Sequence, residues 1–283
     1  MIIWLASYPK SGNTWVRSII SSLLYSNDGN FNFELIKKIS QFPEKKYFKE
    51  LMNDFDNFDK IKENWILAQE SLNLDNKIKL LKTHHGKYTV GNDSFTNDQN
   101  TLATIYIVRD PRTLISSISN HYTLTLDDAS NFLMTPQIIG NKKRWEEKET
   151  GMKCLLGKWN DHYRSWTRVK NNLLLIKYED LIHNPESELE KIINFLKKYL
   201  NIKTNDDKNK KILKTTSFKN LKEMETKGLF KENVLNKEDN SKVNFFHLGP
   251  ANNWKDNLNE DVKNKIEKNF YEEMAELEYL QLE

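Results

Sequence analysis

Four short apolar runs alternate with segments of helical periodicity along this chain. The runs occupy residues 2–6, 78–83, 104–108 and 173–177. Each is rich enough in apolar residues for burial, which is typical of strands in a parallel sheet. Strands separated by helices need crossover connections, so the pattern predicts an α/β fold with a central parallel β-sheet flanked by helices on both faces. Ligand sites in such folds lie at the carboxyl ends of the strands.

Apolar residues at helical spacing mark the segments between and after these runs. After Gly12 the apolar residues from Trp15 to Leu24 follow this spacing, and Pro185 stands at a first-turn position before another amphipathic stretch. Further helices are expected around residues 115–118, over 159–169 and over 259–280. No repeat and no change of composition marks a boundary, so we expect a single domain over residues 1–283.

Composition narrows the classes of function. There are 43 Lys and Arg residues against 40 Asp and Glu, and a net charge of +3 argues against a surface built to bind nucleic acid. No window approaches the roughly 18 continuous apolar residues of a membrane helix, which excludes an integral membrane protein. The single cysteine, Cys154, has no partner for an internal disulfide, and the apolar run at residues 1–6 is too short for a signal peptide. These features predict a cytoplasmic protein.

The loop S-Y-P-K-S-G-N-T-W at residues 7–15 follows the first predicted strand and begins the first predicted helix. Backbone N–H groups of a turn that leads into a helix form an anion site, Gly12 permits close approach of a ligand, and Lys10 adds positive charge. A Walker A loop places its lysine directly after its second glycine, whereas Lys10 precedes Gly12, which disfavours an ATP-binding kinase. Taken alone, the loop also fits a plain turn in which Ser11 and Asn13 cap the helix.

The second feature is the sequence R-D-P-R at residues 109–112, directly after the third predicted strand. An arginine at the end of a buried strand faces the crevice where ligands bind, and its planar guanidinium suits a phosphate. Ser117, two helical turns further, adds a hydroxyl. Taken alone, the feature also fits a structural ion pair between Arg109 and Asp110 that closes the turn at Pro111.

Together the two features resemble the phosphate-binding segments of the cytosolic sulfotransferases, which use 3′-phosphoadenosine 5′-phosphosulfate (PAPS). The family's first loop reads Y-P-K-S-G-T-T-W, and this chain matches it except at Asn13. The family's second segment reads R-N-P-K-D with a serine eight residues after the arginine, and Arg109 and Ser117 keep that separation. The resemblance implies a P-loop-kinase-like fold and a site for the two phosphate ends of the nucleotide.

Further matches follow in the same order and span nearly the whole chain. Lys82-Thr83-His84 resembles the family's K-T-H, whose histidine is the catalytic base. Tyr178 matches a tyrosine that contacts the nucleotide, and Thr216 and Phe218 match the family's T-S-F-K. The main departure is His247-Leu248, which stands where the family has the Arg-Lys pair of its R-K-G segment.

The resemblance implies transfer of a sulfuryl group from PAPS to a hydroxyl acceptor, which leaves a sulfate ester and 3′-phosphoadenosine 5′-phosphate (PAP). We expect His84 to take the acceptor proton, Lys10 to stabilise charge on the departing phosphate, and Lys82 to steady the sulfuryl oxygens. His85 is expected to point to the opposite face, because side chains alternate along a strand. The cofactor-binding residues implied are Lys10, Ser11, Gly12, Asn13, Thr14, Trp15, Arg109, Ser117, Tyr178, Thr216, Phe218 and Gly249.

Neither the chemistry nor the sequence calls for a metal, because the six histidines and one cysteine show no ligand spacing. Two other functions stay open: a P-loop-like nucleotide kinase or hydrolase, and a non-catalytic nucleotide-binding module.

The sequence does not identify the acceptor, since a small molecule, a glycan and a lipid fit equally well. It also leaves open whether the protein forms a homodimer. Residues 31–64 and 121–150 are the expected acceptor-facing segments, with aromatic residues such as Phe42 and Phe48.

Overall fold

The computed structural model describes residues 1–140, 152–232, 234–235 and 242–280. The chain divides into two compact units, and each unit is assembled from segments that are distant in sequence. The first unit consists of residues 1–8, 40–107 and 135–175, and the second of residues 9–39, 108–134 and 176–283. The expectation of a single domain stays a prediction.

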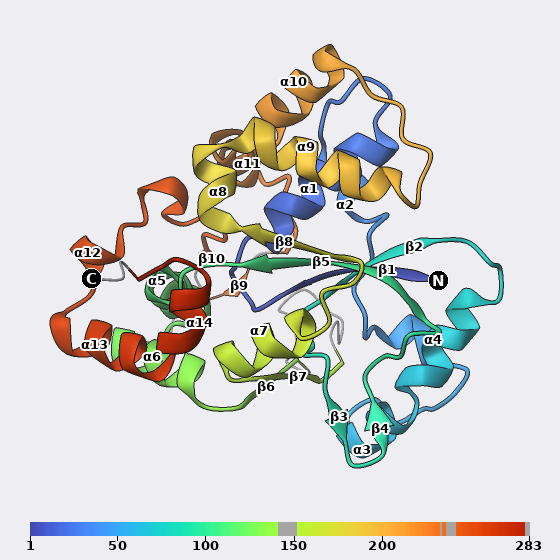
Figure 1. The fold of residues 1–283 in the computed structure, drawn as a ribbon, viewed down its shortest axis with the longest axis horizontal. Helices are drawn as coiled ribbons and strands as arrows, with labels where there is room; N and C mark the ends of the chain where they lie inside the picture. Colours follow the sequence, from blue (N-terminus) through green and yellow to red (C-terminus); the bar gives the residue numbers. More distant parts are fainter. Residues whose placement is uncertain (141–151, 233, 236–241, 281–283) are drawn as a thin grey trace. The chain divides into compact units, whose positions relative to one another are not determined.

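The first unit is built on a four-stranded sheet with the strand order β2-β1-β5-β8 (Figure 1). Strand β1 (Ile2–Ser7) lies between β2 (Lys79–Thr83) and β5 (Thr101–Val108) and pairs in parallel with both. All six residues of β1 are buried, as expected for an apolar central strand. Strand β8 (Leu173–Lys177) forms the edge opposite β2, and the last residues of β5 and β8 belong to the second unit. The predicted α/β fold with a central parallel sheet is confirmed.

Shorter elements and an aromatic core complete the first unit. The elements are η1 (Lys45–Tyr47), α3 (Phe58–Glu63), α4 (Trp65–Asn73), β3 (Thr89–Val90), β4 (Asp93–Ser94), β6 (Gln137–Ile139), β7 (Cys154–Gly157) and α7 (Trp159–Thr167). The ring of Trp4 packs against those of Phe42 and Phe95 at centroid distances of 5.6 and 5.4 Å. Phe42 and Phe48 are fully buried against each other in this core. Both are therefore core side chains and not the acceptor-facing residues that the sequence predicted.

The second unit is mostly helical. Its elements are α1 (Asn13–Tyr25), α2 (Phe33–Ile36), α5 (Pro111–Tyr122), α6 (Leu126–Met134), α8 (Tyr178–His183), α9 (Pro185–Lys197), α10 (Asp206–Thr215), α11 (Phe218–Thr226), β9 (Val234–Leu235), β10 (Lys242–Val243), η2 (Gly249–Ala251), α12 (Trp254–Asn257), α13 (Glu260–Asn269) and α14 (Tyr271–Glu276). Its phenylalanine-rich core includes Phe31, Phe33, Phe230 and Phe246. The helix predicted over 259–280 is in fact two helices, because the buried Phe270 between α13 and α14 leaves helical geometry (φ −121°, ψ 22°).

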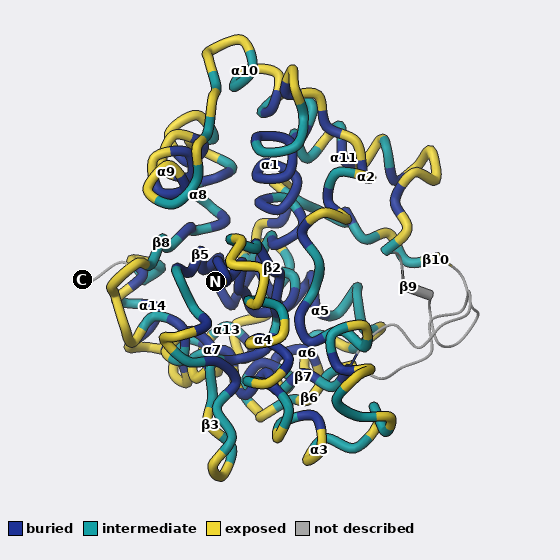
Figure 2. Tube along the Cα trace, turned by 90° about the vertical axis from the view of Figure 1, so that its right-hand side faces the viewer, coloured by how far each residue is buried: buried dark blue, intermediate teal, exposed yellow. Residues whose placement is uncertain are grey.

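Burial follows the predicted pattern of strands and helices. In Figure 2 the sheet strands are coloured mostly as buried, whereas the tip of the β3–β4 hairpin is exposed. Helix α9 begins at Pro185, as predicted, and its apolar stripe, which includes Leu189 and Ile192, is buried. Across the described part of the chain, none of the helices combines the length and the apolar character needed to cross a membrane.

Candidate active site

The loop between β1 and α1 has the geometry of an anion site. Lys10 and Gly12 both have positive φ angles, of 67° and 102°. Gly12 is the N-cap residue of α1, no side chain caps the helix, and its first turn has no acidic residue. The alternative in which Ser11 and Asn13 cap the helix is therefore not what the chain adopts. A helix N-terminus without a side-chain cap, preceded by such a turn, offers its N–H groups to an anion.

The surroundings of Gly12 and Ser11 explain why this loop contains a glycine and a serine at these positions. A Cβ atom added at Gly12 would lie 2.6 Å from Cδ2 of Tyr178, so a larger residue cannot replace this glycine without displacing the ring. Ser11 is fully buried, and its Oγ has no hydrogen-bond partner among the described residues. A buried hydroxyl without a partner costs free energy unless a ligand or water satisfies it. Ser11 therefore fits a loop that receives phosphate oxygens. Asn13 and Thr14 are buried in the first turn of α1.

Arg109 joins the two predicted phosphate-binding segments. Its Nη1 donates to Oγ of Ser117 at 3.1 Å and to the carbonyl oxygen of Lys10 at 3.3 Å. Its Nε donates to Oγ1 of Thr113 at 3.0 Å. The guanidinium lies 4.1 Å from the ring centroid of Tyr178, and only 4% of the residue is exposed. The arginine is thus oriented from several sides, and its contact with the Lys10 carbonyl brings the two segments together.

Asp110 forms its ion pair with Arg112, so the alternative of an Arg109–Asp110 pair is wrong. The Asp110 side chain accepts from the backbone N–H of Arg112 as the N-cap of α5, and the Arg112 guanidinium lies 2.7 Å from its carboxylate. Arg112 also contacts Glu267 at 2.6 Å and stacks on the ring of Trp254 at 4.1 Å. These contacts draw Arg112 and Asp110 towards the carboxyl-terminal helices and leave the Arg109 guanidinium to Ser117 and Thr113.

Tyr178 and Trp15 support the same loop. Tyr178 is 5% exposed, and its ring meets that of Trp15 edge-on at a centroid distance of 5.7 Å. Burial raises the pKa of the Tyr178 hydroxyl, with Arg109 opposing that shift, so the phenol stays neutral. The ring packs on Gly12 and under Arg109 and therefore positions the residues expected to hold the phosphates.

The Phe218 and Gly249 segments meet at helix α11. A Cβ atom added at Gly249, which has φ 57°, would lie 2.2 Å from Cζ of Phe218, so only glycine fits against this ring. Thr216 is buried, and its Oγ1 donates to the carbonyl oxygen of Ile212 at 2.7 Å. Lys222 Nζ donates to the carbonyl oxygen of His247 at 2.9 Å.

Helix α11 also holds the segment before Gly249. The Glu225 carboxylate accepts from the backbone N–H groups of Phe245 and Phe246 at 2.7 and 3.0 Å. Lys10 lies on the same segment, because its Nζ is 3.5 Å from the ring centroid of Phe245 and 3.4 Å from the Phe245 carbonyl oxygen. The sequence indicated neither Glu225 nor Lys222, since charged residues are common throughout this chain. Thr113 was also missed from the sequence, although its position could have revealed it. Thr113 lies four residues before Ser117 on α5, and this spacing places both side chains on the same face of a helix.

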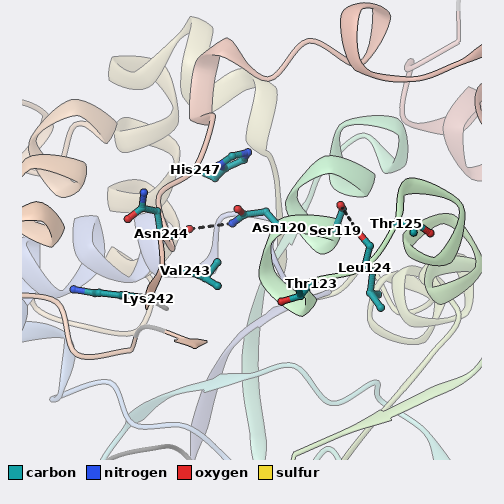
Figure 3. Close-up of a pocket in the computed structure, with 9 residues that line it drawn as sticks. All are labelled: Ser119, Asn120, Thr123, Leu124, Thr125, Lys242, Val243, Asn244 and His247. Carbon is teal, nitrogen blue, oxygen red and sulfur yellow. Dashed lines mark hydrogen bonds between the residues drawn. The ribbon is translucent and has the colours of Figure 1, made fainter. Parts of the chain in front are cut away.

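His247 faces a pocket of about 580 Å³ in the second unit (Figure 3). The pocket is lined by Ser119, Asn120, Thr123, Leu124, Thr125, Lys242, Val243, Asn244 and His247. Most of these side chains are polar, and Nδ2 of Asn120 donates to the carbonyl oxygen of Asn244 at 3.0 Å. Burial, Lys222 and Lys10 together lower the pKa of His247. His247 therefore lies in positively charged surroundings and is less basic than an ordinary histidine.

His84 lies in the first unit, directly after β2 ends at Thr83. Its Nδ1 lies 2.8 Å from the carbonyl oxygen of Ser7 and 3.3 Å from Oγ of the same residue. A carbonyl oxygen only accepts, so Nδ1 carries the proton of the neutral ring and Nε2 carries the lone pair. This is the tautomer that a general base acting through Nε2 requires.

His85 is fully buried in an aromatic cluster. Its ring stacks on that of Phe95 at a centroid distance of 4.2 Å and meets Trp65 at 4.6 Å. Burial lowers the pKa of His85 to about 3, so this histidine stays neutral. The two histidines thus lie in different environments, as predicted, but both follow the end of β2, so strand alternation is not the cause. Lys82 is 8% exposed, and its backbone pairs with Ser40 and Phe42.

No cluster of His, Cys, Asp or Glu side chains suited to a metal ion occurs within residues 1–140, 152–232, 234–235 and 242–280. The second unit brings together Lys10, Arg109, Ser117 and Tyr178, and joins Phe218 to Gly249. The first unit contains Lys82 and His84.

Comparison with known proteins identifies the family. The sulfotransferase domain matches residues 2–278. Sulfotransferase 1 family member D1 of mouse is 26% identical over 282 residues, which cover 97% of this chain and 83% of the relative. An amine sulfotransferase of rabbit is 24% identical over 280 residues, with 97% and 81% covered. The crystal structure of mouse sulfotransferase SULT7A1 complexed with PAP superposes with a TM-score of 0.60 at 23% identity and covers 96% of this chain and 84% of that one. This chain belongs to the sulfotransferase domain family.

Proposed function

We propose that this chain is a PAPS-dependent sulfotransferase in which Arg109 and Ser117 bind the 3′-phosphate, Lys10 acts on the 5′-phosphate, and His84 is the general base. The observation that carries the proposal is the pair of hydrogen bonds from Arg109 to Ser117 and to the Lys10 carbonyl. Either segment alone fits a structural role. Their contact places a buried cation, a hydroxyl and an uncapped helix N-terminus together, which suits a nucleotide with phosphates at both ends.

PAPS supplies a sulfuryl group attached to a phosphate that departs with the electrons of the broken bond. The positive charge of Lys10 stabilises negative charge on that phosphate. The N–H groups at the start of α1 and the Ser11 hydroxyl bind phosphate oxygens, which orients the nucleotide. Lys82 is proposed to steady the sulfuryl oxygens. Phe218 would pack beside the nucleotide base and Trp15 would contact the nucleotide, and Gly249 leaves room for the Phe218 ring.

His84 removes the proton of the acceptor hydroxyl. The bond from Nδ1 to the Ser7 carbonyl leaves the lone pair on Nε2, and that nitrogen accepts the proton. General base catalysis of this kind contributes roughly 10²–10⁴ to a rate. His85 has no role in the chemistry, because its ring is enclosed by Phe95 and Trp65.

The acceptor is proposed to be a small molecule that carries a hydroxyl group. Relatives differ in acceptor, since the name of the rabbit relative specifies an amine, so family membership alone leaves the acceptor open. The proposed compartment is the cytoplasm, where the buried free thiol of Cys154 stays reduced. The donor is proposed to be bound without a metal ion.

Radiolabelled PAPS and a panel of acceptors test the function. The panel contains a phenol, a steroid alcohol, a sugar and an amine, and wild type and His84→Ala are compared. We expect label on at least one acceptor with wild type and almost none with the variant. Binding of PAP without transfer to any acceptor would instead favour a non-catalytic module. Turnover of ATP with magnesium in the absence of PAPS would favour a nucleotide kinase or hydrolase.

A further inference from the structure

The loop that carries His84 is held by one face of helix α7. Strand β2 ends at Thr83, so the ladder of the sheet does not fix residues 84–87. Within the first unit, the side chains of His162, Ser165 and Trp166 reach this loop. Residues spaced by three and four positions lie on the same face of a helix, so α7 presents these three groups side by side.

Each of the three side chains bonds to a different backbone group of the loop. Nε2 of His162 lies 3.1 Å from the carbonyl oxygen of His84. Nε1 of Trp166 donates to the carbonyl oxygen of His85 at 2.9 Å. Oγ of Ser165 accepts from the backbone N–H of Lys87 at 2.9 Å. Side chains of α7 therefore hold the backbone around His84, together with the bond from the Gly86 N–H to the Leu155 carbonyl oxygen at 2.9 Å.

The direction of the His162 bonds follows from its environment. His162 is fully buried, and burial lowers its pKa to about 3, so the ring is neutral and one nitrogen donates while the other accepts. The His84 carbonyl only accepts, so Nε2 of His162 donates to it. Nδ1 then accepts from the Tyr106 hydroxyl, 2.8 Å away on β5. Tyr106 is itself 1% exposed, so this bond ties the His162 ring to a buried strand of the sheet.

We propose that His162 is a positioning residue that, through the His84 carbonyl, keeps the His84 ring on Ser7 with its lone pair on Nε2. The inference rests on the proposed role of His84 as general base. The bond from His84 Nδ1 to the Ser7 carbonyl is 2.8 Å long, and such bonds weaken steeply when the donor shifts or tilts. Loss of the His162 contact leaves the His84 carbonyl without this donor, although Trp166 and the bond from the Gly86 N–H to the Leu155 carbonyl still hold the next residues. The His84 ring then shifts on Ser7, and both tautomers become populated. His162 touches no reacting atom in this role.

The test follows the tautomer of His84 by NMR in the full-length protein with isotope-labelled histidine and PAP. His84→Gln identifies the His84 signals by their loss. In wild type we expect a single Nδ1–H tautomer for neutral His84, and in His162→Phe a mixture of both tautomers. His162→Gln, whose amide donates from nearly the same point as Nε2, should restore the single tautomer. The control is Arg164→Gln, since Arg164 is exposed on the opposite face of α7 and the variant should match wild type.

The outcomes separate the inference from the proposed function. A folded His162→Phe protein that keeps the single Nδ1–H tautomer overturns the positioning role and leaves His84 as base. An Nε2–H tautomer in the wild type instead overturns the base geometry itself. PAP affinity within about twofold of wild type shows that the variant is folded and that its nucleotide site is intact. If His162→Phe does not fold, His162→Leu, which also removes the donor to the His84 carbonyl, takes its place with the same two outcomes.

Discussion

Replacing Arg109 with alanine should weaken the binding of PAP far more than the binding of ADP, which lacks the 3′-phosphate. A guanidinium has five N–H donors, and in this structure Nε and Nη1 are used by Thr113, Ser117 and the Lys10 carbonyl. No hydrogen bond of Nη2 occurs among the described residues, so its two N–H groups are available to donate to phosphate oxygens in the proposed site. Each charged hydrogen bond contributes about 1.5–3 kcal/mol, and loss of a single one corresponds to a factor of roughly 10 to 150 in affinity.

Isothermal titration calorimetry with PAP and ADP measures both affinities on the same protein. We expect Arg109→Ala to lose at least about tenfold for PAP and almost nothing for ADP. Ser117→Ala, which removes one neutral partner and keeps the cation, should lose roughly two- to tenfold for PAP. The control is Arg168→Ala, since Arg168 is exposed beyond the end of α7 and its loss should change neither affinity.

Two results would refute this reasoning. Equal losses for PAP and ADP would mean that Arg109 supports the loop at Lys10 as a structural residue and does not read the 3′-phosphate. Equal affinities of the wild type for PAP and ADP would mean that the protein does not recognise the 3′-phosphate at all. A melting temperature close to that of wild type is needed for the first comparison, because Arg109 also packs on Tyr178.

Lys10→Met should lower the transfer rate much more than the affinity for PAPS, because charge on the departing phosphate grows mainly in the transition state. Single-turnover rates and equilibrium binding measure the two effects, and a loss confined to binding would contradict the prediction. His84→Ala should lose roughly 10²–10⁴ in rate with unchanged PAP affinity, whereas His85→Leu should remain active; activity in both variants would exclude the proposed base. The pKa values of His85 and His162 are lowered from 6.5 to about 3 by burial, so below about pH 6.5 the unfolded chain binds more protons and stability is lost as the pH falls. Urea unfolding at about pH 7 and about pH 5 should show a smaller loss for His85→Leu than for wild type, and equal losses would refute the buried neutral state of His85.

Local signals in the sequence indicated the strands of the sheet and the two candidate phosphate-binding segments. The run at 173–177 coincides with strand β8, and the predicted helix after Gly12 begins at Asn13. These features depend on residues close to one another along the chain, namely apolar runs, helical spacing and a glycine at a tight turn. The same signals missed short elements such as α2 and the β3–β4 hairpin, because a few residues carry too little periodicity.

The choice of partner among charged residues was decided only by the tertiary structure. The sequence suggested an ion pair between Asp110 and its neighbour Arg109. In the structure the Asp110 carboxylate pairs with Arg112, which Glu267 and Trp254 also contact. Glu267 and Trp254 lie more than a hundred residues away, so no local pattern could reveal that competition. An ion pair is stable where several contacts hold both side chains in the same geometry, and those contacts exist only after the helices pack.

The two adjacent histidines also differ in ways that the sequence predicted only in part. The sequence placed His84 and His85 at the end of a strand and predicted that they would differ. Only the fold supplied the Ser7 carbonyl that orients His84, the Phe95 and Trp65 rings that enclose His85, and the α7 side chains that hold their backbone. The identity of the residues and their order along the chain determine which chemical groups are available for catalysis and binding. Burial and hydrogen-bond partners, which set protonation and orientation, come from segments that meet only in the folded protein.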